Sequence, residues 1–295
     1  MFYILYSIRR LRGELTLDQI RYLRYFTKRY PLTVVGIVII FLVVLVSLAA
    51  PLISPHNPYT LNLIDRLKPP GGPYLLGTDE LGRDILSRII YGARLSLMAG
   101  VGIVGIAGLF GILIGSVSGL LGGKIDIVIM RLMDIMLAFP SLVLALALSA
   151  ALGPNFRNSI LAIAIVKIPV YVRLVRGQAL SIKERQFVKA AHTFGAPKAW
   201  IISRHIIPNC LAPVVVQATL GIGEAILIAA TLSFIGLGAQ PPAAEWGAMV
   251  SMGRTYLLDQ WWYASFPGIA IFITVIGFNL FGDGVRDMLD PRFHN

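Results

Sequence analysis

Residues 33–53, TVVGIVIIFLVVLVSLAAPLI, decide the class of protein to which this chain belongs. The stretch has no charged residue, and fifteen of its twenty-one residues are Leu, Ile, Val or Phe. As an α-helix it crosses the ~30 Å hydrocarbon layer of a bilayer. At roughly −0.3 to −0.6 kcal/mol for each such residue, insertion is favourable by about 5–9 kcal/mol. Because thirty-two residues precede the stretch, a secretory signal is disfavoured, and we expect an uncleaved membrane anchor.

The composition of the whole chain agrees with a membrane protein. Of its 295 residues, 56% are hydrophobic and 14% are charged, and the mean hydropathy is +0.75. Soluble domains carry about 25% charged residues, so this chain lacks the polar residues to cover soluble cores. It has one cysteine, Cys210, and no Cys/His cluster with zinc spacing. The composition therefore excludes a disulfide framework, a zinc module and a disordered chain.

Five further apolar runs predict an all-α, polytopic membrane protein with six transmembrane helices. The runs cover residues 95–121, 127–152, 159–175, 212–237 and 264–281. The expected organisation is an N-terminal basic and aromatic segment (1–31), a first transmembrane helix (32–53), an extracytoplasmic loop (54–94), a five-helix core (95–285) with an internal loop (177–209), and a C-terminal segment (286–295). An even number of spans places both termini on the same side of the membrane.

The basic residues are distributed unequally between the two sides of the membrane. The formal net charge is +11, and alternating the segments puts eighteen Lys and Arg residues on the side of the termini and seven on the other. By the positive-inside rule, both termini are expected in the cytoplasm. Basic residues spread over several loops also argue against nucleic-acid binding. The basic, aromatic residues 1–31 suit either a helix along the inner membrane surface or a plain basic flank.

Polar and small residues inside the spans predict contacts between helices. Gly111, Gly115 and Gly119 recur at i, i+4 and i+8, a pattern that lets a second helix approach closely. Lys167 near the middle of a span makes membrane insertion less favourable by about 2.5–3.5 kcal/mol. Glu224 likewise places a charge inside the next span. These charges either line a translocation path or pair structurally, with Asp134 as a further candidate partner. The sequence leaves both interpretations open.

Aromatic residues gather before the last span. They are Trp246, Tyr256, Trp261, Trp262 and Tyr263. Tyr and Trp are enriched where a membrane meets water, so we expect an interfacial belt on the outer side rather than a ligand cage.

The loop of residues 177–209 is expected to form two short helices joined by a hinge. Ser181 and Glu184 have capping-box spacing, which predicts the start of the first helix. Its apolar face is expected to comprise Phe187, Ala190, Ala191 and Phe194. Gly195 suits the position just past a helix end, Pro197 can begin the second helix, and Pro208 is expected to end it. The pair either rests on the lipid surface or projects as a rigid knob that docks in another protein.

Motifs in this loop and beyond it resemble a known family. Lys189-Ala190-Ala191, Gly195 and His205-Ile206-Ile207-Pro208 resemble the "EAA" loop of ABC importer permeases. Other passages are similar to the permease subfamily that serves dipeptide, oligopeptide and nickel importers: LGTDELGRD (76–84) with YGAR (91–94), AFP (138–140), LSFIGLG (232–238) with PP (241–242) and WG (246–247), and FNLFGDG (278–284) with LDPR (289–292). The resemblance extends from about residue 30 to the end of the chain.

The resemblance implies a type I ABC importer permease fold and a mechanism of alternating access in the inner (cytoplasmic) membrane. It implies contact with an ATPase through Phe187, Lys189, Ala190, Ala191, Phe194, Gly195, Ala196, Arg204 and Pro208. It also implies four partners: a second, related permease, two ATP-binding subunits and an extracytoplasmic solute-binding protein. The family has glutamate where this chain has Lys189. We therefore expect the ATPase to present an acidic or neutral group opposite Lys189. We also expect residues 56–94 and 236–263 to form the dock for the binding protein and the outer gate, because they are the only long segments expected on the outer side.

The sequence contains no motif for catalysis. The Gly123-Lys124 dipeptide is followed by Ile125 rather than Ser or Thr, so a Walker A loop is absent. No nucleophile elbow or HExxH helix is present. We expect no enzyme activity and no cofactor in this chain, with ATP and Mg²⁺ bound by the partner ATPases. The expected cargo is dipeptides or oligopeptides. The alternatives are oligosaccharide or nickel cargo, a secondary transporter, and a structural membrane protein.

Overall fold

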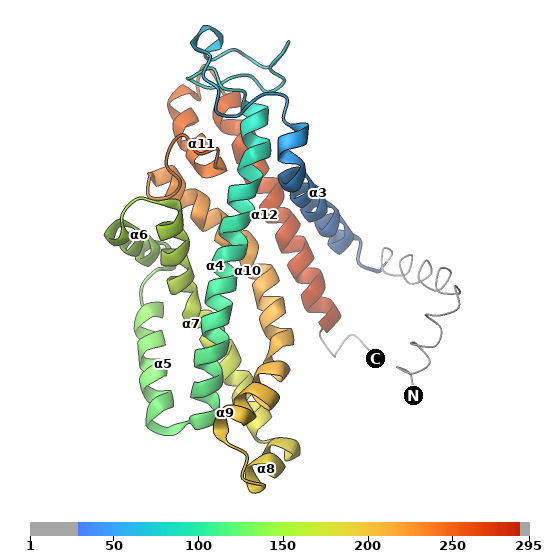
Figure 1. Cartoon of the computed structure of the whole chain (residues 1–295), viewed down its shortest axis with the longest axis vertical. Helices are drawn as coiled ribbons and strands as arrows, with labels where there is room; N and C mark the ends of the chain where they lie inside the picture. Colours follow the sequence, from blue (N-terminus) through green and yellow to red (C-terminus); the bar gives the residue numbers. More distant parts are fainter. Residues whose placement is uncertain (1–28, 290–295) are drawn as a thin grey trace, which may run out of the picture.

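The computed structural model describes residues 29–289 of this chain, and this part is helical, without a β-strand. The predicted segments 1–31 and 286–295 lie largely outside the described residues. The elements in chain order are α3 (Pro31–Ile53), η1 (Leu63–Asp65), α4 (Ile85–Leu121), α5 (Gly123–Leu137), α6 (Ser141–Leu152), α7 (Phe156–Lys183), α8 (Gln186–Thr193), α9 (Lys198–Ile201), the π-helical turn η2 (Ile202–Ile206), α10 (Ile207–Ile235), α11 (Trp246–Gly253), η3 (Arg254–Tyr256) and α12 (Trp262–Leu289). The prediction of an all-α membrane protein is confirmed (Figure 1).

Five of the described helical segments are long and apolar enough to cross a membrane. They are α3, α4, α7, the continuous segment Lys198–Ile235 and α12. The sixth predicted span, residues 127–152, is broken: α5 and α6 meet at 93° around Ala138, Phe139 and Pro140. Proline cannot donate a backbone hydrogen bond, and it disfavours helical geometry in the residue before it. With 15 and 12 residues, the two helices are about 22 Å and 18 Å long at 1.5 Å per residue, so neither crosses ~30 Å alone.

The helix α4 begins ten residues earlier than the apolar run suggested. Its N-cap is Asp84, whose side chain accepts a hydrogen bond from the backbone N–H of Ser87. The predicted loop 54–94 therefore ends at residue 84. Hydropathy placed the start at residue 95 because Arg88 and Arg94 interrupt the run, but Arg88 is fully buried and Arg94 donates to the carbonyl of Ser47 (2.8 Å). The helix α12 likewise continues to Leu289, past the predicted end of the five-helix core.

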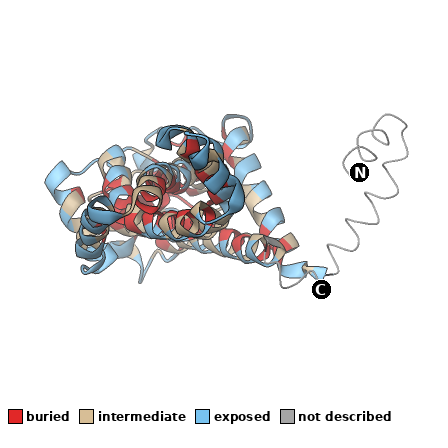
Figure 2. Cartoon of the chain, turned by 90° about the horizontal axis from the view of Figure 1, so that it is seen from below, coloured by how far each residue is buried: buried red, intermediate tan, exposed pale blue. Residues whose placement is uncertain are grey.

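The glycine stripe on α4 packs against α7 as predicted. A Cβ atom at Gly111 would lie 2.2 Å from Cβ of Tyr171, and one at Gly119 would lie 2.5 Å from Cβ of Ala179. At Gly115 it would lie 2.7 Å from the carbonyl oxygen of Val172. The two backbones therefore approach more closely than any side chain would allow. Figure 2 shows the buried residues toward the middle of the helical bundle and the exposed residues on its outward faces.

The molecule has two ends along its long axis, which we call the α8 end and the α11 end. The helices α8 and α9 form the first, and α11 with residues 54–84 forms the second, at the opposite end of the long axis (Figure 1). Trp246, Trp262 and Tyr263 are buried in a small hydrophobic cluster at the α11 end, together with Ile85 and Met249. For these three aromatic residues the prediction of an interfacial belt is wrong, because the α11 end folds around its own core. Trp261 remains half-exposed.

Candidate functional site

The α8 element begins after a two-residue turn, Glu184 and Arg185, and ends in a tight turn. Ser181 lies inside α7, and the residue that precedes α8 is Arg185, so the predicted capping box is wrong. The end of the helix was predicted correctly: Gly195 has φ +79°, its N–H donates to His192, and the N–H of Ala196 donates to Ala191 (both 3.0 Å). These two bonds make a Schellman motif, which satisfies the last carbonyls of the helix.

The predicted apolar face of α8 points away from the rest of the chain. Phe194 is 90% exposed, Phe187 and Ala190 are also exposed, and Val188 on the opposite face is buried. Ala191 and Ala196 are partly buried against the main hydrophobic core. The helix is thus held by one face and leaves two aromatic rings open at the end of the molecule.

A row of aromatic rings, which the sequence did not reveal, fixes α8 against the second helix. The ring centroid of His205 lies 5.5 Å from that of Phe187 and 5.0 Å from that of Trp200. Such spacing is typical of favourable tilted and edge-to-face contacts. His205 is carried by the π-helical turn, so the position of α8 depends on that turn. Helical periodicity within α8 contains no signal for this contact.

The helix at Pro208 continues instead of ending there. The N–H of Ile207 bonds to the carbonyl of Ile202, five residues earlier, and the helical segment is continuous from Lys198 to Ile235. Pro208 offers no N–H to the carbonyl of Arg204, and its ring would clash there in a regular α-helix. The wider π-turn relieves this clash, and the Asn209 side chain donates to the carbonyl of His205 (2.7 Å). The prediction that Pro208 stops the helix is therefore wrong.

The unusual Lys189 has a partner in its own chain. Its ammonium lies 3.0 Å from a carboxylate oxygen of Glu184, and both side chains are exposed. The hydrogen bond from Lys189 lowers the pKa of the Glu184 carboxyl. An exposed pair of this kind contributes little to the stability of a fold, because water screens both charges. Arg204, another expected contact, is exposed on the π-turn.

The three charged residues predicted within the spans separate into two pairs. Lys167 of α7 forms an ion pair with Glu224 of α10. Asp134 of α5 is bound by Arg173 of α7 instead, at 2.6 Å. Lys167 therefore finds its counter-ion inside the chain, which is one of the two interpretations that the sequence left open. An unpaired charge at this depth would cost about 2.5–3.5 kcal/mol.

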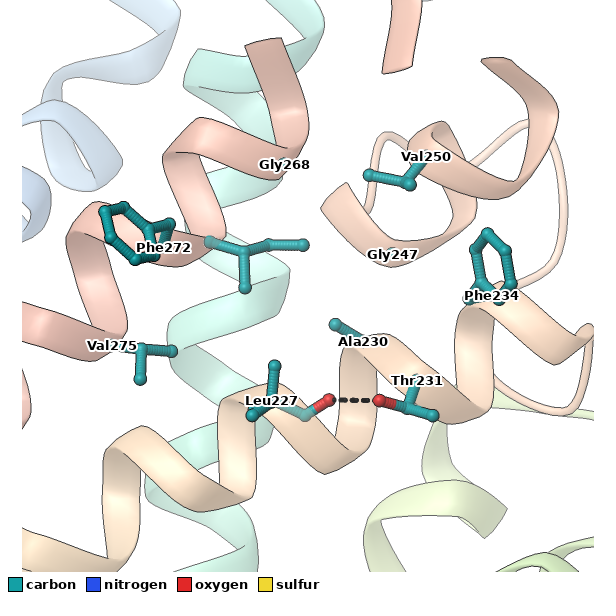
Figure 3. A pocket seen from close by; sticks show the side chains of 10 residues that line it. Leu227, Ala230, Thr231, Phe234, Gly247, Val250, Gly268, Phe272 and Val275 are labelled. Atoms are coloured by element: carbon teal, nitrogen blue, oxygen red, sulfur yellow. Dashed lines mark hydrogen bonds between the residues drawn. The ribbon is translucent and has the colours of Figure 1, made fainter. Parts of the chain in front are cut away.

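An apolar pocket of about 360 Å³ opens between α10, α11 and α12. Figure 3 shows its lining, with Leu227, Ala230, Thr231 and Phe234 from α10, Gly247 and Val250 from α11, and Gly268, Phe272 and Val275 from α12. The hydroxyl of Thr231 donates its hydrogen to the carbonyl of Leu227 (2.8 Å) and is thus not free to donate to a ligand. The pocket offers apolar surface and almost no hydrogen-bonding groups.

The α11 end is held together by buried charges. Asp79 accepts hydrogen bonds from the backbone N–H of Leu81 and Arg83 (both 2.9 Å) and from Nε of Arg83 (2.6 Å). Arg88 lies 3.5 Å from Asp79 and donates to the carbonyls of Pro58 (3.0 Å) and Ala243 (3.4 Å). It thereby connects residues 54–84 to the loop before α11. The LGTDELGRD motif contains Asp79 and Arg83, but its sequence alone does not reveal this network.

A buried carboxylate begins α11. Glu245 accepts hydrogen bonds from the backbone N–H groups of Gly247 (3.1 Å) and Ala248 (2.9 Å). Burial raises the pKa of this carboxyl, and the two backbone hydrogen bonds oppose part of the rise. Among the described residues, no group of three or more His, Cys, Asp or Glu side chains is arranged to hold a metal ion.

Comparison with known proteins identifies the family of this helical bundle. Residues 111–295, more than half of the chain, match the family described as "Binding-protein-dependent transport system inner membrane component". The chain belongs to this family. Residues 22–70 match a second family, the N-terminal transmembrane domain of oligopeptide transport permease C. This permease is therefore a component of a binding-protein-dependent transport system and a multi-pass membrane protein.

Several curated relatives are similar over most of their length. The chain is 56% identical to a probable D,D-dipeptide transport system permease protein of Escherichia coli over 268 residues, which cover 91% of this chain and 90% of the relative. It is 48% identical to a dipeptide transport system permease protein of Alkalihalophilus pseudofirmus (90% and 87% covered). A di/tripeptide transport system permease protein of Pseudomonas aeruginosa is 47% identical (88% and 88% covered). The family membership sets aside the secondary transporter and the structural membrane protein.

Proposed function

We propose that this permease translocates dipeptides and oligopeptides by alternating access, as one membrane half of an ATP-driven importer. The names of its relatives support a peptide cargo rather than oligosaccharide or nickel. The observation that carries the mechanism is the exposed, rigidly capped α8. Two aromatic rings project from it, and its neighbour α9 continues without interruption into a membrane span.

The proposed contact with the ATPase involves the exposed face of α8 and the turn after it. Phe187 and Phe194 supply apolar contact area, and Ala190 and Gly195 leave room for close approach. Ala191, Ala196, Arg204 and Pro208 belong to the supporting part of the element. Because Glu184 already neutralises Lys189, the partner surface needs no acidic group at this point, and a neutral one suffices. This refines the expectation drawn from the sequence.

The conformational change of the ATPase would be transmitted to the permease through this contact. A conformational change requires that the driving partner interact differently with its two states, and α9–α10 connects the contact directly to the middle of the membrane. ATP and Mg²⁺ would be bound by the two partner subunits, and this chain would supply neither catalysis nor a cofactor site. A second, related permease would complete the path, with Lys167 and Glu224 facing it. Asp134 is assigned to the α5–α7 contact with Arg173.

The two ends would then face opposite compartments. We place the α8 end and both termini in the cytoplasm, in agreement with the excess of basic residues on that side. The α11 end, including residues 56–84 and 236–263, would form the outer gate and the dock for the solute-binding protein. Its buried Asp79–Arg88 network supports this role, since a rigid platform loses little conformational entropy when a partner binds.

The decisive experiment is to co-purify the permease with its partner subunits, reconstitute it in liposomes and measure ATP turnover. Peptides, oligosaccharides and nickel are each offered with the binding protein. Stimulation by short peptides alone is the expected result, and stimulation by another class would overturn the proposed cargo.

A matched pair of variants tests the coupling contact. Phe194→Ala should weaken retention of the ATPase subunits during purification and lower stimulated turnover, because Phe194 is 90% exposed at the α8 end. Phe41→Ala removes a ring that is also largely exposed, but on the span α3, and should leave retention of the ATPase unchanged. Equal retention in both variants would contradict the assigned contact.

A further inference from the structure

The ion pair between Lys167 and Glu224 is open on one side. The Lys167 side chain is 12% exposed, whereas the Glu224 side chain is 56% exposed on the surface of this chain. A carboxylate can accept about four hydrogen bonds and an ammonium can donate three, so a single contact leaves both groups with unused capacity. The pair can therefore bind a further charged group without losing all of its existing contacts.

The depth of the pair places it near the middle of the membrane. Lys167 lies eleven residues from the start of α7, and Glu224 lies eleven residues from the end of α10. At 1.5 Å per residue, both are about 16 Å from the helix termini at the α11 end, within a layer of ~30 Å. Charges at this depth face protein or water rather than lipid. The open side of Glu224 therefore faces a protein partner or an aqueous path.

Two polar side chains near the ion pair have other partners. One turn further toward the α8 end, the Tyr171 hydroxyl donates to the backbone carbonyl of Gln217 (3.5 Å). Asp134 is bound by Arg173 on the α5 side of α7. Among the described residues at this depth, Lys167 and Glu224 thus supply one positive and one negative group side by side. This arrangement is complementary to a solute that carries one charge of each sign.

The apolar pocket lies on the same face of α10 as Glu224. Glu224, Leu227, Thr231 and Phe234 recur at i, i+3, i+7 and i+10, so they share one side of the helix. The last three of these residues line the pocket of about 360 Å³ (Figure 3). A solute that enters from the α11 end therefore meets apolar surface first and the ion pair next.

We propose that Lys167 and Glu224 form a transient subsite for the two charged ends of a peptide, an inference that rests on the proposed function. Glu224 receives the α-ammonium group, Lys167 receives the α-carboxylate, and the pocket accommodates apolar side chains. As the peptide arrives, the internal ion pair opens and each partner gains an opposite charge, so one ion contact becomes two. The charges of Lys167, Glu224 and the two ends of the peptide sum to zero throughout. Each charged end of the peptide thus has a counter-ion while it crosses a region of low dielectric constant.

The test compares three cargoes in liposomes that contain the complete importer with its binding protein. The cargoes are alanyl-alanine, its N-acetyl form, which lacks the ammonium group, and its amide, which lacks the carboxylate. Uptake is measured for the wild type, Glu224→Gln and Lys167→Gln. Each glutamine removes one charge but retains hydrogen-bonding capacity. Asp134→Asn, which weakens the separate ion pair with Arg173, is the matched control.

The expected result is a crossed pattern. Glu224→Gln should reduce the preference for the free dipeptide over the N-acetyl form by about tenfold, the effect of one charged hydrogen bond, and leave the preference over the amide intact. Lys167→Gln should do the reverse. Asp134→Asn should change uptake of all three cargoes by the same factor.

Two other outcomes are distinguishable from this pattern. If the Glu224 and Lys167 variants change uptake of all three cargoes equally, or not at all, the subsite is refuted while dipeptide import stands. If the wild type imports no free dipeptide, the proposed function fails and the subsite fails with it.

Discussion

Replacing Gly111 with alanine should separate α4 from α7 and destabilise the permease. The added Cβ would lie 2.2 Å from Cβ of Tyr171 and 3.0 Å from its carbonyl carbon. Ordinary contact begins near 3.4 Å, so the helices must move apart by about 1.2 Å, the difference between these two distances. A change of side-chain rotamer cannot relieve the clash, because the atoms concerned are Cβ and backbone. Overpacking of this kind costs about 1–3 kcal/mol.

The matched control is Gly105→Ala on the same helix. A Cβ at Gly105 would meet nothing within 4 Å. Both variants gain the same intrinsic helix propensity, about 1 kcal/mol, so the difference between them isolates the clash. The measurement is the thermal midpoint of the purified complex in detergent. We expect Gly105→Ala to melt at or above the wild-type temperature and Gly111→Ala to melt below it by several degrees. Equal midpoints for the two variants would refute the close approach of α4 and α7.

Three further predictions concern the two ends of the molecule. Arg88→Met should destabilise the α11 end by about 1–3 kcal/mol, because it leaves the carbonyls of Pro58 and Ala243 without their donor. Faster proteolysis of residues 54–84 would reveal this, and Arg66→Met, an exposed change, should have no such effect. Burial raises the pKa of the Glu245 carboxyl above its ordinary value of 4.5. The protonated carboxyl therefore stabilises the fold below pH 4.5, and this stabilisation is lost as the pH rises through the raised pKa. Glu245→Gln should remove this contribution to the pH dependence of the thermal midpoint. Gly195→Ala should destabilise the end of α8 by about 1–2 kcal/mol, because φ is +79° there and a Cβ disfavours left-handed backbone. Amide hydrogen exchange in α8 should therefore accelerate. Gly177→Ala, inside α7 with open space around it, should leave the exchange rate of α8 unchanged.

Local signals in the sequence were sufficient for much of this architecture. The run of residues 33–53 predicted α3, because apolar length alone determines whether a helix can cross a bilayer. The spacing of Gly111, Gly115 and Gly119 predicted a close helix contact, since only small residues permit it. Gly195 was correctly placed after the first short helix, because the left-handed conformation there favours glycine. In each case the signal lies within one continuous stretch of the sequence.

The errors arose where contacts distant in sequence decide the outcome. Hydropathy started the second span at residue 95, after Arg88, because it cannot tell that Asp79 and distant carbonyls contact this buried guanidinium. The aromatic residues Trp246 and Tyr263 suggested a lipid interface, but they pack into the core of the α11 end. Pro208 was expected to end a helix, since the cost of proline is usually decisive, and the π-turn before it removes that cost.

The candidate site shows the same division. Helical periodicity predicted an apolar face on α8 but left open what covers it, and Glu224 was among the partners proposed for Lys167. The sequence did not indicate that Glu184 pairs with Lys189, because the predicted capping box assigned Glu184 to a different bond. It also gave no sign of the contact between His205 and Phe187, which depends on how the second helix is rotated.

The π-helical turn Ile202–Ile206 has a consequence for the direction in which α8 points. Each residue turns an α-helix by about 100°, so one residue more or less at this turn changes the azimuth of everything before it relative to the span. Deleting one residue here would restore regular winding and swing the two exposed phenylalanine rings to another side of the molecule. The permease would still insert in the membrane, but in the proposed importer its aromatic rings would no longer face the ATPase. The winding of this one turn thus sets the orientation of α8 relative to the span that follows it.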